Sequence, residues 1–218
     1  MRMAPVPPIL AIALLTIACE RSADEADNAA RDTTEMAAVS VQTLFRGIAS
    51  TGEGGLTFVP CGTTDTVALA DSAHVLQNVT ANRSAEPHFV IVAGRRGTEL
   101  AVEEVLYATT ETFECHSDWS SFEYRAAGNN PGWLIEVMGP RVQLRREGGQ
   151  TTEFSLAQND SVQGRIRILA DDTSQRRLEL HLQQQACRNP VTGAYSAWSA
   201  RARLGPETLN GCAMIGRQ

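Results

Sequence analysis

The five cysteines are the residues of this sequence with the most reactive side chains: Cys19, Cys61, Cys115, Cys187 and Cys212. A cysteine thiol can form a disulfide, bind a soft metal ion or act as a nucleophile, and the redox state of its compartment decides which. Five is an odd number, so full pairing leaves one cysteine that needs another role. If Cys19 carries a modification, the other four form an even set for disulfides.

The first residues of the chain predict export. Arg2 precedes an apolar run over residues 9–18, which is too short for a membrane span of about 20 residues and matches the core of a secretory signal. The letters LTIAC that end at Cys19 resemble a bacterial lipobox, with Thr16 where that motif usually has leucine. The resemblance implies a lipoprotein signal peptide over residues 1–18 and a lipidated Cys19 that anchors the chain to a membrane. The alternative is an ordinary cleaved signal followed by a free thiol.

Residues 19–40 are predicted to be the lipidated cysteine and a disordered acidic linker. Between residues 20 and 40 the chain has six acidic side chains, two arginines and almost no large apolar residues. Such a segment cannot bury enough surface to offset the entropy of ordering it. Glu20, and not aspartate, follows the cysteine; by similarity to enterobacterial lipoproteins, this implies the outer membrane.

Export favours disulfide formation, because the compartments outside the cytoplasm are oxidising. Four cysteines allow three sets of pairs. We expect Cys61–Cys115 and Cys187–Cys212, one disulfide in each half of the chain, each worth about 3–4 kcal/mol in the chain-entropy model. Crossed pairs within a single sheet system are the alternative.

Alternation of apolar and polar residues predicts β-strands along most of the chain after residue 40. The clearest example is residues 178–182, where three leucines alternate with Glu179 and His181, a pattern typical of an antiparallel sheet with one solvated face. Residues 71–82 have the apolar spacing of one short helix. We therefore predict a mainly β protein of two small antiparallel β-barrel-like (or sandwich) domains with one short helix, after the signal peptide and linker.

We place the boundary between the two domains at the serine-rich segment 117–121. This gives an N-terminal β domain of residues 41–119 and a C-terminal β domain of residues 120–218. Glycine, asparagine, aspartate and proline residues mark the turns between the strands. The predicted strands are 44–50, 56–59, 66–70, 88–93, 100–114, 122–127, 133–138, 142–146, 152–157, 162–169, 178–182 and 197–204.

The C-terminal domain resembles a family of bacterial envelope lipoproteins from about Tyr124 onward. That family has a Gly-Asn-Glu-Pro-Phe-Trp-like motif, then a cysteine with a small-residue turn and an aromatic strand, and a final Gly-Cys-Ala. Asn130 stands where the family has glutamate and Gly132 where it has phenylalanine. If either family side chain contacts a ligand, this protein lacks that contact. The matching segments are Gly128–Trp133, Cys187–Tyr195 and Gly211–Ala213.

The N-terminal domain is similar to the barrels of NlpE-type and HslJ-like (META) envelope proteins. The similarity covers residues 45–47, 58–62 and 66–69. It implies a link to envelope stress, adhesion sensing and copper tolerance. The copper link belongs to a Cys-x-x-Cys pair, and this chain has Cys61 alone, so copper handling is not implied here. Neither resemblance implies an enzyme activity.

The histidines and nucleophiles predict neither a metal centre nor an active site. Cys115 and His116 could bind a soft metal, but oxidation of the cysteine removes the required thiolate. The other three histidines have no ligand spacing, and the sequence has no Gly-x-Ser-x-Gly elbow. Glu103 and Glu104 are adjacent and therefore point to opposite faces of a strand. We expect no catalytic residues, no metal and no cofactor.

Large aromatic residues near strand ends are the remaining candidates for a binding site, because they either fill a barrel core or line its mouth. We identify Trp133, Trp198, Asn129 and Tyr195 as candidate ligand-lining residues. For the tryptophans, core filling is the commoner role, and a nearby pocket or apolar patch would favour ligand binding.

Together these features predict a membrane-tethered, non-enzymatic lipoprotein of the cell envelope, linked to envelope stress or integrity. We expect it at the outer membrane, on the periplasmic face or the surface, with an envelope protein or a small apolar ligand as partner. A purely structural or stress-associated protein without a ligand is the first alternative, and a hydrolase with an unrecognised site is the second. A net charge of −6 gives no electrostatic reason to expect a nucleic-acid partner.

Overall fold

The computed structural model describes residues 43–80 and 86–216, and most of them lie in β-strands. The prediction of a mainly β protein with barrels and one short helix is confirmed. The signal peptide, Cys19 and the acidic linker lie outside the described residues. Residues 41–218 belong to one compact unit, and the division of this unit into domains at residue 119 stays a prediction.

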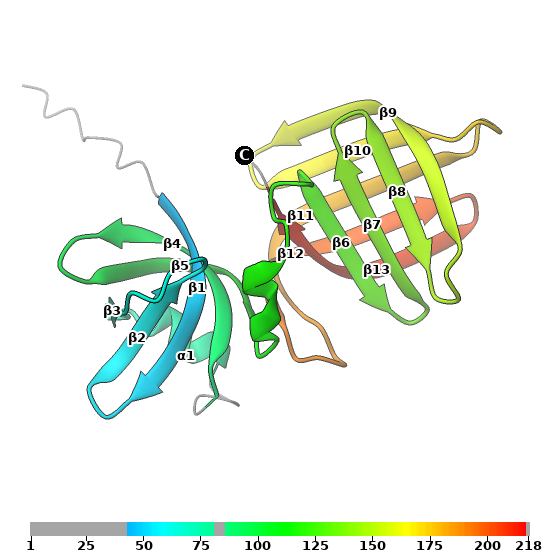
Figure 1. Ribbon diagram of the computed structural model, residues 1–218. Helices are drawn as coiled ribbons and strands as arrows, with labels where there is room; N and C mark the ends of the chain where they lie inside the picture. The colour runs from blue at the N-terminus through cyan, green and yellow to red at the C-terminus, as the bar shows by residue number, and fades with distance from the viewer. Residues whose placement is uncertain (1–42, 81–85, 217–218) are drawn as a thin grey trace, which may run out of the picture. The chain divides into compact units, whose positions relative to one another are not determined.

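The first five strands close a ring. Strand β1 pairs with both β2 and β4, β4 pairs with β5, and β3 connects β2 to β5 (Figure 1). The β3–β5 pair is parallel, and helix α1 (Val75–Thr80) lies between β3 and β4 in the chain. This strand order with this helix is the connectivity of an OB fold. The strands are β1 (Thr43–Gly52), β2 (Gly55–Pro60), β3 (Val67–Ala70), β4 (His88–Arg96) and β5 (Leu100–Thr109).

The remaining eight strands form a second, larger barrel that is antiparallel throughout. Each strand pairs with the next one along the chain, and the β6–β13 pair closes the ring (Figure 1). The strands are β6 (Tyr124–Asn129), β7 (Gly132–Met138), β8 (Arg141–Arg146), β9 (Thr151–Val162), β10 (Arg165–Asp171), β11 (Arg177–Arg188), β12 (Tyr195–Leu204) and β13 (Glu207–Ile215).

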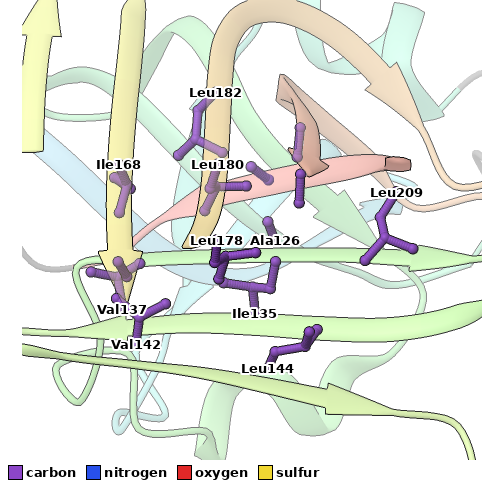
Figure 2. Packing of buried hydrophobic residues seen from close by; sticks show 14 of the residues in the cluster. Ala126, Ile135, Val137, Val142, Leu144, Ile168, Leu178, Leu180, Leu182 and Leu209 are labelled. Carbon is purple, nitrogen blue, oxygen red and sulfur yellow. The ribbon is translucent and has the colours of Figure 1, made fainter. Parts of the chain in front are cut away.

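The interior of this eight-stranded barrel is filled with aliphatic side chains. Leu178, Leu180 and Leu182 of β11 point inward and pack with Ile168 of β10 and Ile135 of β7 (Figure 2). The residues between them on each strand face outward, which is why the sequence alternates with a period of two. Burial of these side chains supplies the main stabilisation of the barrel.

The five-stranded barrel has apolar residues on both faces of one strand. Val90 and Val92 of β4 belong to its interior, where Leu76 of α1 also packs. Phe89 and Ile91 alternate with them on the outer face and are buried as well. The residues that cover part of this outer face lie in the connection between the barrels, which includes the short 3₁₀ helix η2 (Thr112–His116).

Several elements have other bounds than predicted; among them, β9 and β11 run on to Val162 and Arg188, five and six residues beyond the predicted strands. The strand predicted over residues 100–114 ends at Thr109, and η2 follows it. The strand predicted from residue 162 begins at Arg165, because Gln163 and Gly164 form a turn with positive φ angles of 35° and 72°. Strand β13 was not predicted, since small residues occupy its inner face and weaken the alternation. The helix begins at Val75, and the end of its predicted range lies in the undescribed residues 81–85.

Both expected disulfides, Cys61–Cys115 and Cys187–Cys212, are present. The first connects the residue that follows β2 to η2 across 54 residues of sequence, and the second connects β11 to β13 across 25. Their presence indicates an oxidising compartment outside the cytoplasm. Among the described residues, no helix is long and apolar enough to span a membrane.

Candidate functional site

An apolar pocket lies where the two barrels share a strand contact. Tyr195 and Ser196 of β12 pair with Ala108 and Tyr107 of β5. Beside this contact is a cavity of about 230 Å³, which we name the seam pocket. It is lined by Leu44, Ile91, Ala93, Glu104, Leu106, Tyr107, Gln184, Trp198, Met214 and Ile215.

One side of the seam pocket is the outer face of the five-stranded barrel. Ile91 and Ala93 alternate with the core valines of β4, so their side chains point outward. Leu44 of β1 pairs with Ala93 and is 44% exposed. A barrel exterior is normally polar; of these three apolar residues, Ile91 and Ala93 are buried, and Leu44 leaves surface that a ligand or partner could cover.

Trp198 forms part of the other side. It precedes Ala200 and Ala202 on the inner face of β12, and its half-buried ring packs against the end of the eight-stranded core. Its backbone N–H donates a 3.1 Å hydrogen bond to the Ser196 hydroxyl, which in turn donates to the carbonyl of Ala213 on β13. These bonds fix the backbone beside the indole, so the ring is held at the pocket.

The polar groups of the seam pocket are Tyr107, Glu104 and Gln184. The side-chain amide of Gln184 donates to a Glu104 carboxylate oxygen at 3.5 Å. Burial, aided by the nearby carboxylates of Glu114 and Glu111, raises the pKa of the Tyr107 phenol above its usual range. The phenol therefore keeps its proton at physiological pH and remains a hydrogen-bond donor.

The ring of Tyr107 packs in an aromatic cluster with Phe89 and Trp119. Its ring centroid lies 5.8 Å from that of Trp119 and 6.1 Å from that of Phe89. The Trp119 indole N–H donates a 3.0 Å hydrogen bond to the carbonyl of Glu114, next to the disulfide-bonded Cys115. The first disulfide thus fixes the segment that holds Trp119 over the barrel.

Trp133 occupies a different place from Trp198. Its side chain is 4% exposed and belongs to the core of the eight-stranded barrel. The indole lies against Gly128 on the paired strand, where a Cβ atom would come within 2.4 Å of its nitrogen. The indole N–H is buried and has no hydrogen-bond partner among the described residues. Trp133 does not line the seam pocket.

The two other candidate residues lie near the loop between β11 and β12. The Asn129 amide donates a 2.6 Å hydrogen bond to Asn189 of that loop, although 60 residues separate them. Tyr195 is half-buried against the core of the five-stranded barrel, and burial raises the pKa of its phenol. The Arg188 guanidinium lies 5.8 Å from its ring centroid. Neither Asn129 nor Tyr195 lines the seam pocket.

Sequence reasoning missed the pocket residues contributed by the five-stranded barrel. A signal existed in residues 88–93, where a continuous apolar run predicts a strand buried on both faces. Such a strand needs a covering on its outer side, which marks it as a contact surface. The pairing of β5 with β12 joins residues far apart in sequence, so the identity of the covering residues could not be read from local pattern.

Within residues 43–80 and 86–216, no group of three or more His, Cys, Asp or Glu side chains is placed to hold a metal ion. Comparisons with protein-family models, with curated proteins and with solved structures found no match. The two family resemblances described above therefore stay predictions.

Proposed function

We propose that this protein is a membrane-tethered, non-enzymatic lipoprotein of the cell envelope that binds a small apolar group in the seam pocket. The observation that carries the proposal is the placement of Trp198 beside a largely apolar cavity at the strand contact between the two barrels. The group belongs to a free small ligand or to a side chain of an envelope protein. Binding of this kind fits a role in envelope stress or integrity, which the resemblance of the N-terminal barrel implies.

Export and tethering rest on two independent features. The two disulfides indicate an oxidising compartment. The lipobox-like sequence before Cys19 supports a lipid anchor, and pairing of all other cysteines leaves that thiol for acylation. The denatured mass of the chain purified from its own host tests the tether. We expect an acylated cysteine at the N-terminus of the mature chain, and an unmodified thiol there would remove the anchor from the proposal.

The size of the pocket supports a small occupant. Pockets for drug-sized ligands usually measure about 300–1,000 Å³, and the seam pocket, at about 230 Å³, is smaller. A cavity of this size suits one aromatic ring or a short acyl segment. Burial of such a group against Trp198 and Ile91 supplies the hydrophobic part of the binding free energy.

The polar groups support recognition and not catalysis. Tyr107 lines the pocket, and its phenol, which stays protonated, is in hydrogen-bond contact with the Thr109 side chain. Glu104 accepts a long hydrogen bond of 3.5 Å from Gln184, and these two side chains bring an acceptor and a donor to the pocket lining. A ligand with an apolar body and one hydroxyl or carbonyl group complements this arrangement.

Methyl NMR on the full acylated chain in lipid nanodiscs tests the pocket, with p-cresol and n-hexanol as probes. The methyl group of Met214 lines the pocket, and that of Met138 lies outside its lining. We expect a saturable shift of the Met214 signal with at least one probe and no shift of the Met138 signal. Equal, non-saturating shifts of both signals would contradict a specific pocket.

A pair of matched variants separates the pocket from the rest of the surface. Ala93→Leu adds three carbons to a residue that lines the pocket, and Ala68→Leu makes the same change at an exposed position on β3. We expect Ala93→Leu to abolish the saturable Met214 shift and Ala68→Leu to preserve it. Retained binding in a folded Ala93→Leu protein would exclude the seam pocket as the site.

A further inference from the structure

Three neighbouring strands of the eight-stranded barrel carry arginines on their outer face. These residues alternate with the buried core positions of β10, β11 and β12, so their side chains are exposed. Arg167 and Arg201 lie on either side of His181 in one row across the sheet. In the next row, Arg203 lies opposite Glu179 in the strand register. We name this surface the arginine face; it consists of Arg165, Arg167, Arg177, Arg201 and Arg203.

Only part of this positive charge is neutralised by neighbouring carboxylates. Glu179 accepts hydrogen bonds from Arg167 at 3.0 Å and from His181 at 2.9 Å, and Asp171 pairs with Arg177 at 2.8 Å. Within the described part of the chain, Arg165, Arg201 and Arg203 form no ion pair.

The arginine face therefore has the opposite charge from the chain as a whole. Its five guanidinium groups exceed the three carboxylates of the same surface, Asp160, Asp171 and Glu179, by two. The whole chain has a net charge of −6. This sheet face thus has a local excess of positive charge, and an excess of one sign on one surface attracts a partner of the opposite sign.

An apolar feature lies within the arginine face. Val162, at the end of β9, is 67% exposed and pairs with Arg165. Beside it is a hollow of about 280 Å³ whose lining includes Asp160, Arg165 and Arg167, and the core residues Ile166 and Leu182 lie at its base with 5% and 1% of their surface exposed. The surface thus combines exposed cationic groups with one exposed apolar side chain, and cationic and apolar residues occur together in elements that lie in a membrane interface.

We propose that the arginine face docks on the anionic phospholipid headgroups of a bilayer, with Val162 entering the interface. Guanidinium groups match the oxygen atoms of phosphate in paired hydrogen bonds. The exposed Val162 distinguishes this partner from a soluble polyanion, which offers nothing apolar. This inference goes beyond the proposed function and does not depend on the seam pocket.

Arginine modification on vesicles tests the docking with the full acylated chain. The protein is bound to vesicles of phosphatidylcholine alone or mixed with phosphatidylglycerol, and phenylglyoxal labelling of each arginine is followed by mass spectrometry. We expect labelling of Arg201 and Arg203 to slow by about fivefold on the anionic vesicles, the factor expected for one arginine near such a surface. Arg96 and Arg141, which are exposed outside the arginine face, serve as internal references.

Matched double variants control for general charge effects. Arg201→Gln/Arg203→Gln is expected to remove most of the protection of Arg165, whereas Arg96→Gln/Arg141→Gln changes the net charge equally and should preserve it. High salt should abolish the protection. Val162→Ser should weaken the protection on anionic vesicles without a change on phosphatidylcholine, since it removes the apolar contact.

Three outcomes would overturn the docking. They are equal labelling on both vesicle types, equal protection of Arg96 and Arg141, and protection by soluble polyphosphate in place of vesicles. Flotation is read separately. A tethered chain floats with both vesicle types, and an untethered chain whose arginine face docks floats only with the anionic ones, so failure of the anchor and failure of the docking are distinguished.

Discussion

The two barrels differ in how their apolar side chains are shielded from water. The eight-stranded barrel encloses its large aliphatic residues, such as Leu180, and exposes charged residues, such as Arg201, outside. The five-stranded barrel keeps apolar residues on both faces of β4, so Phe89 and Ile91 need a cover on the outside. Trp119 covers part of this face, and Ile91 and Ala93 of the same face line the seam pocket.

This difference shows where binding can occur in each region. A barrel that is closed and filled offers a ligand only its exterior or its ends. In the eight-stranded barrel that exterior is charged, which suits a polar surface such as headgroups. In the five-stranded barrel the exterior is apolar beside β5, which suits a small apolar group. The two proposals therefore follow from opposite outer faces.

The largest expected effect comes from removal of the disulfides. Cys61→Ala/Cys115→Ala opens a connection of 54 residues and should lower the free energy of unfolding by about 4 kcal/mol in the chain-entropy model. The same change at Cys187 and Cys212 opens 25 residues and should cost about 3.5 kcal/mol. Chemical denaturation of the three proteins measures both values.

A second readout of these variants sharpens the comparison. Only the first disulfide lies beside the segment that holds Trp119 against Tyr107. We expect the Met214 methyl signal to broaden and probe binding to weaken when Cys61–Cys115 is removed, and both to persist when Cys187–Cys212 is removed. Equal changes at the pocket in the two variants would mean that the packing of Trp119 against Tyr107 does not depend on the disulfide at η2.

The next effect is the loss of a core side chain from the eight-stranded barrel. Leu180 is fully buried, so Leu180→Ala leaves a cavity and should cost about 3 kcal/mol. Leu44→Ala, at an exposed position of the other barrel, should cost about 1 kcal/mol or less while weakening probe binding.

The Leu180→Ala variant also tests the domain boundary. If the barrels are separate domains, denaturation shows two transitions and Leu180→Ala shifts only one. A single transition that shifts as a whole would refute the domain boundary near residue 119.

Much of the fold could be predicted because most strands carry their pattern locally. The leucines at 178, 180 and 182 alternate with polar residues and form β11 as expected. The disulfides followed from counting cysteines and assigning one pair to each half. Strand β13 was missed because Gly211 and Ala213 occupy inner positions. At Gly211 a Cβ atom would lie 2.0 Å from the Ala127 carbonyl oxygen, so close backbone packing, which leaves no hydrophobic signal, determines the residue.

The candidate site could be predicted only in part. Trp198 was selected because large aromatics gather at cores and mouths, and it lines the seam pocket. Trp133 was selected for the same reason and lies in the core. Sequence pattern does not separate the two, since both alternate inward on their strands. The difference arises because Trp198 lies where β12 reaches β5, and that contact between distant segments has no local signature.

The smallest expected effect concerns an ion pair at one end of the eight-stranded barrel. Arg146 donates two hydrogen bonds to Glu207, at 2.7 and 2.6 Å, and this contact lowers the pKa of the Glu207 carboxyl. A lowered pKa in the folded state means that the pair stabilises the fold above the ordinary glutamate value of 4.5 and loses this contribution as the pH falls through the folded pKa. The Glu207 side chain is 38% exposed, so solvent screening limits the contribution to roughly 0.5 kcal/mol.

Thermal unfolding at pH 7 and at pH 3 measures this contribution. Between these two pH values, the Glu207→Gln variant should lose slightly less stability than the unmodified protein. Glu153→Gln removes an exposed carboxylate of the same barrel that forms no ion pair among the described residues, and it serves as the control for the loss of one negative charge. A loss of several kcal/mol at the Glu207 position would mean that the charged exterior of this barrel, and not its aliphatic core, holds it closed.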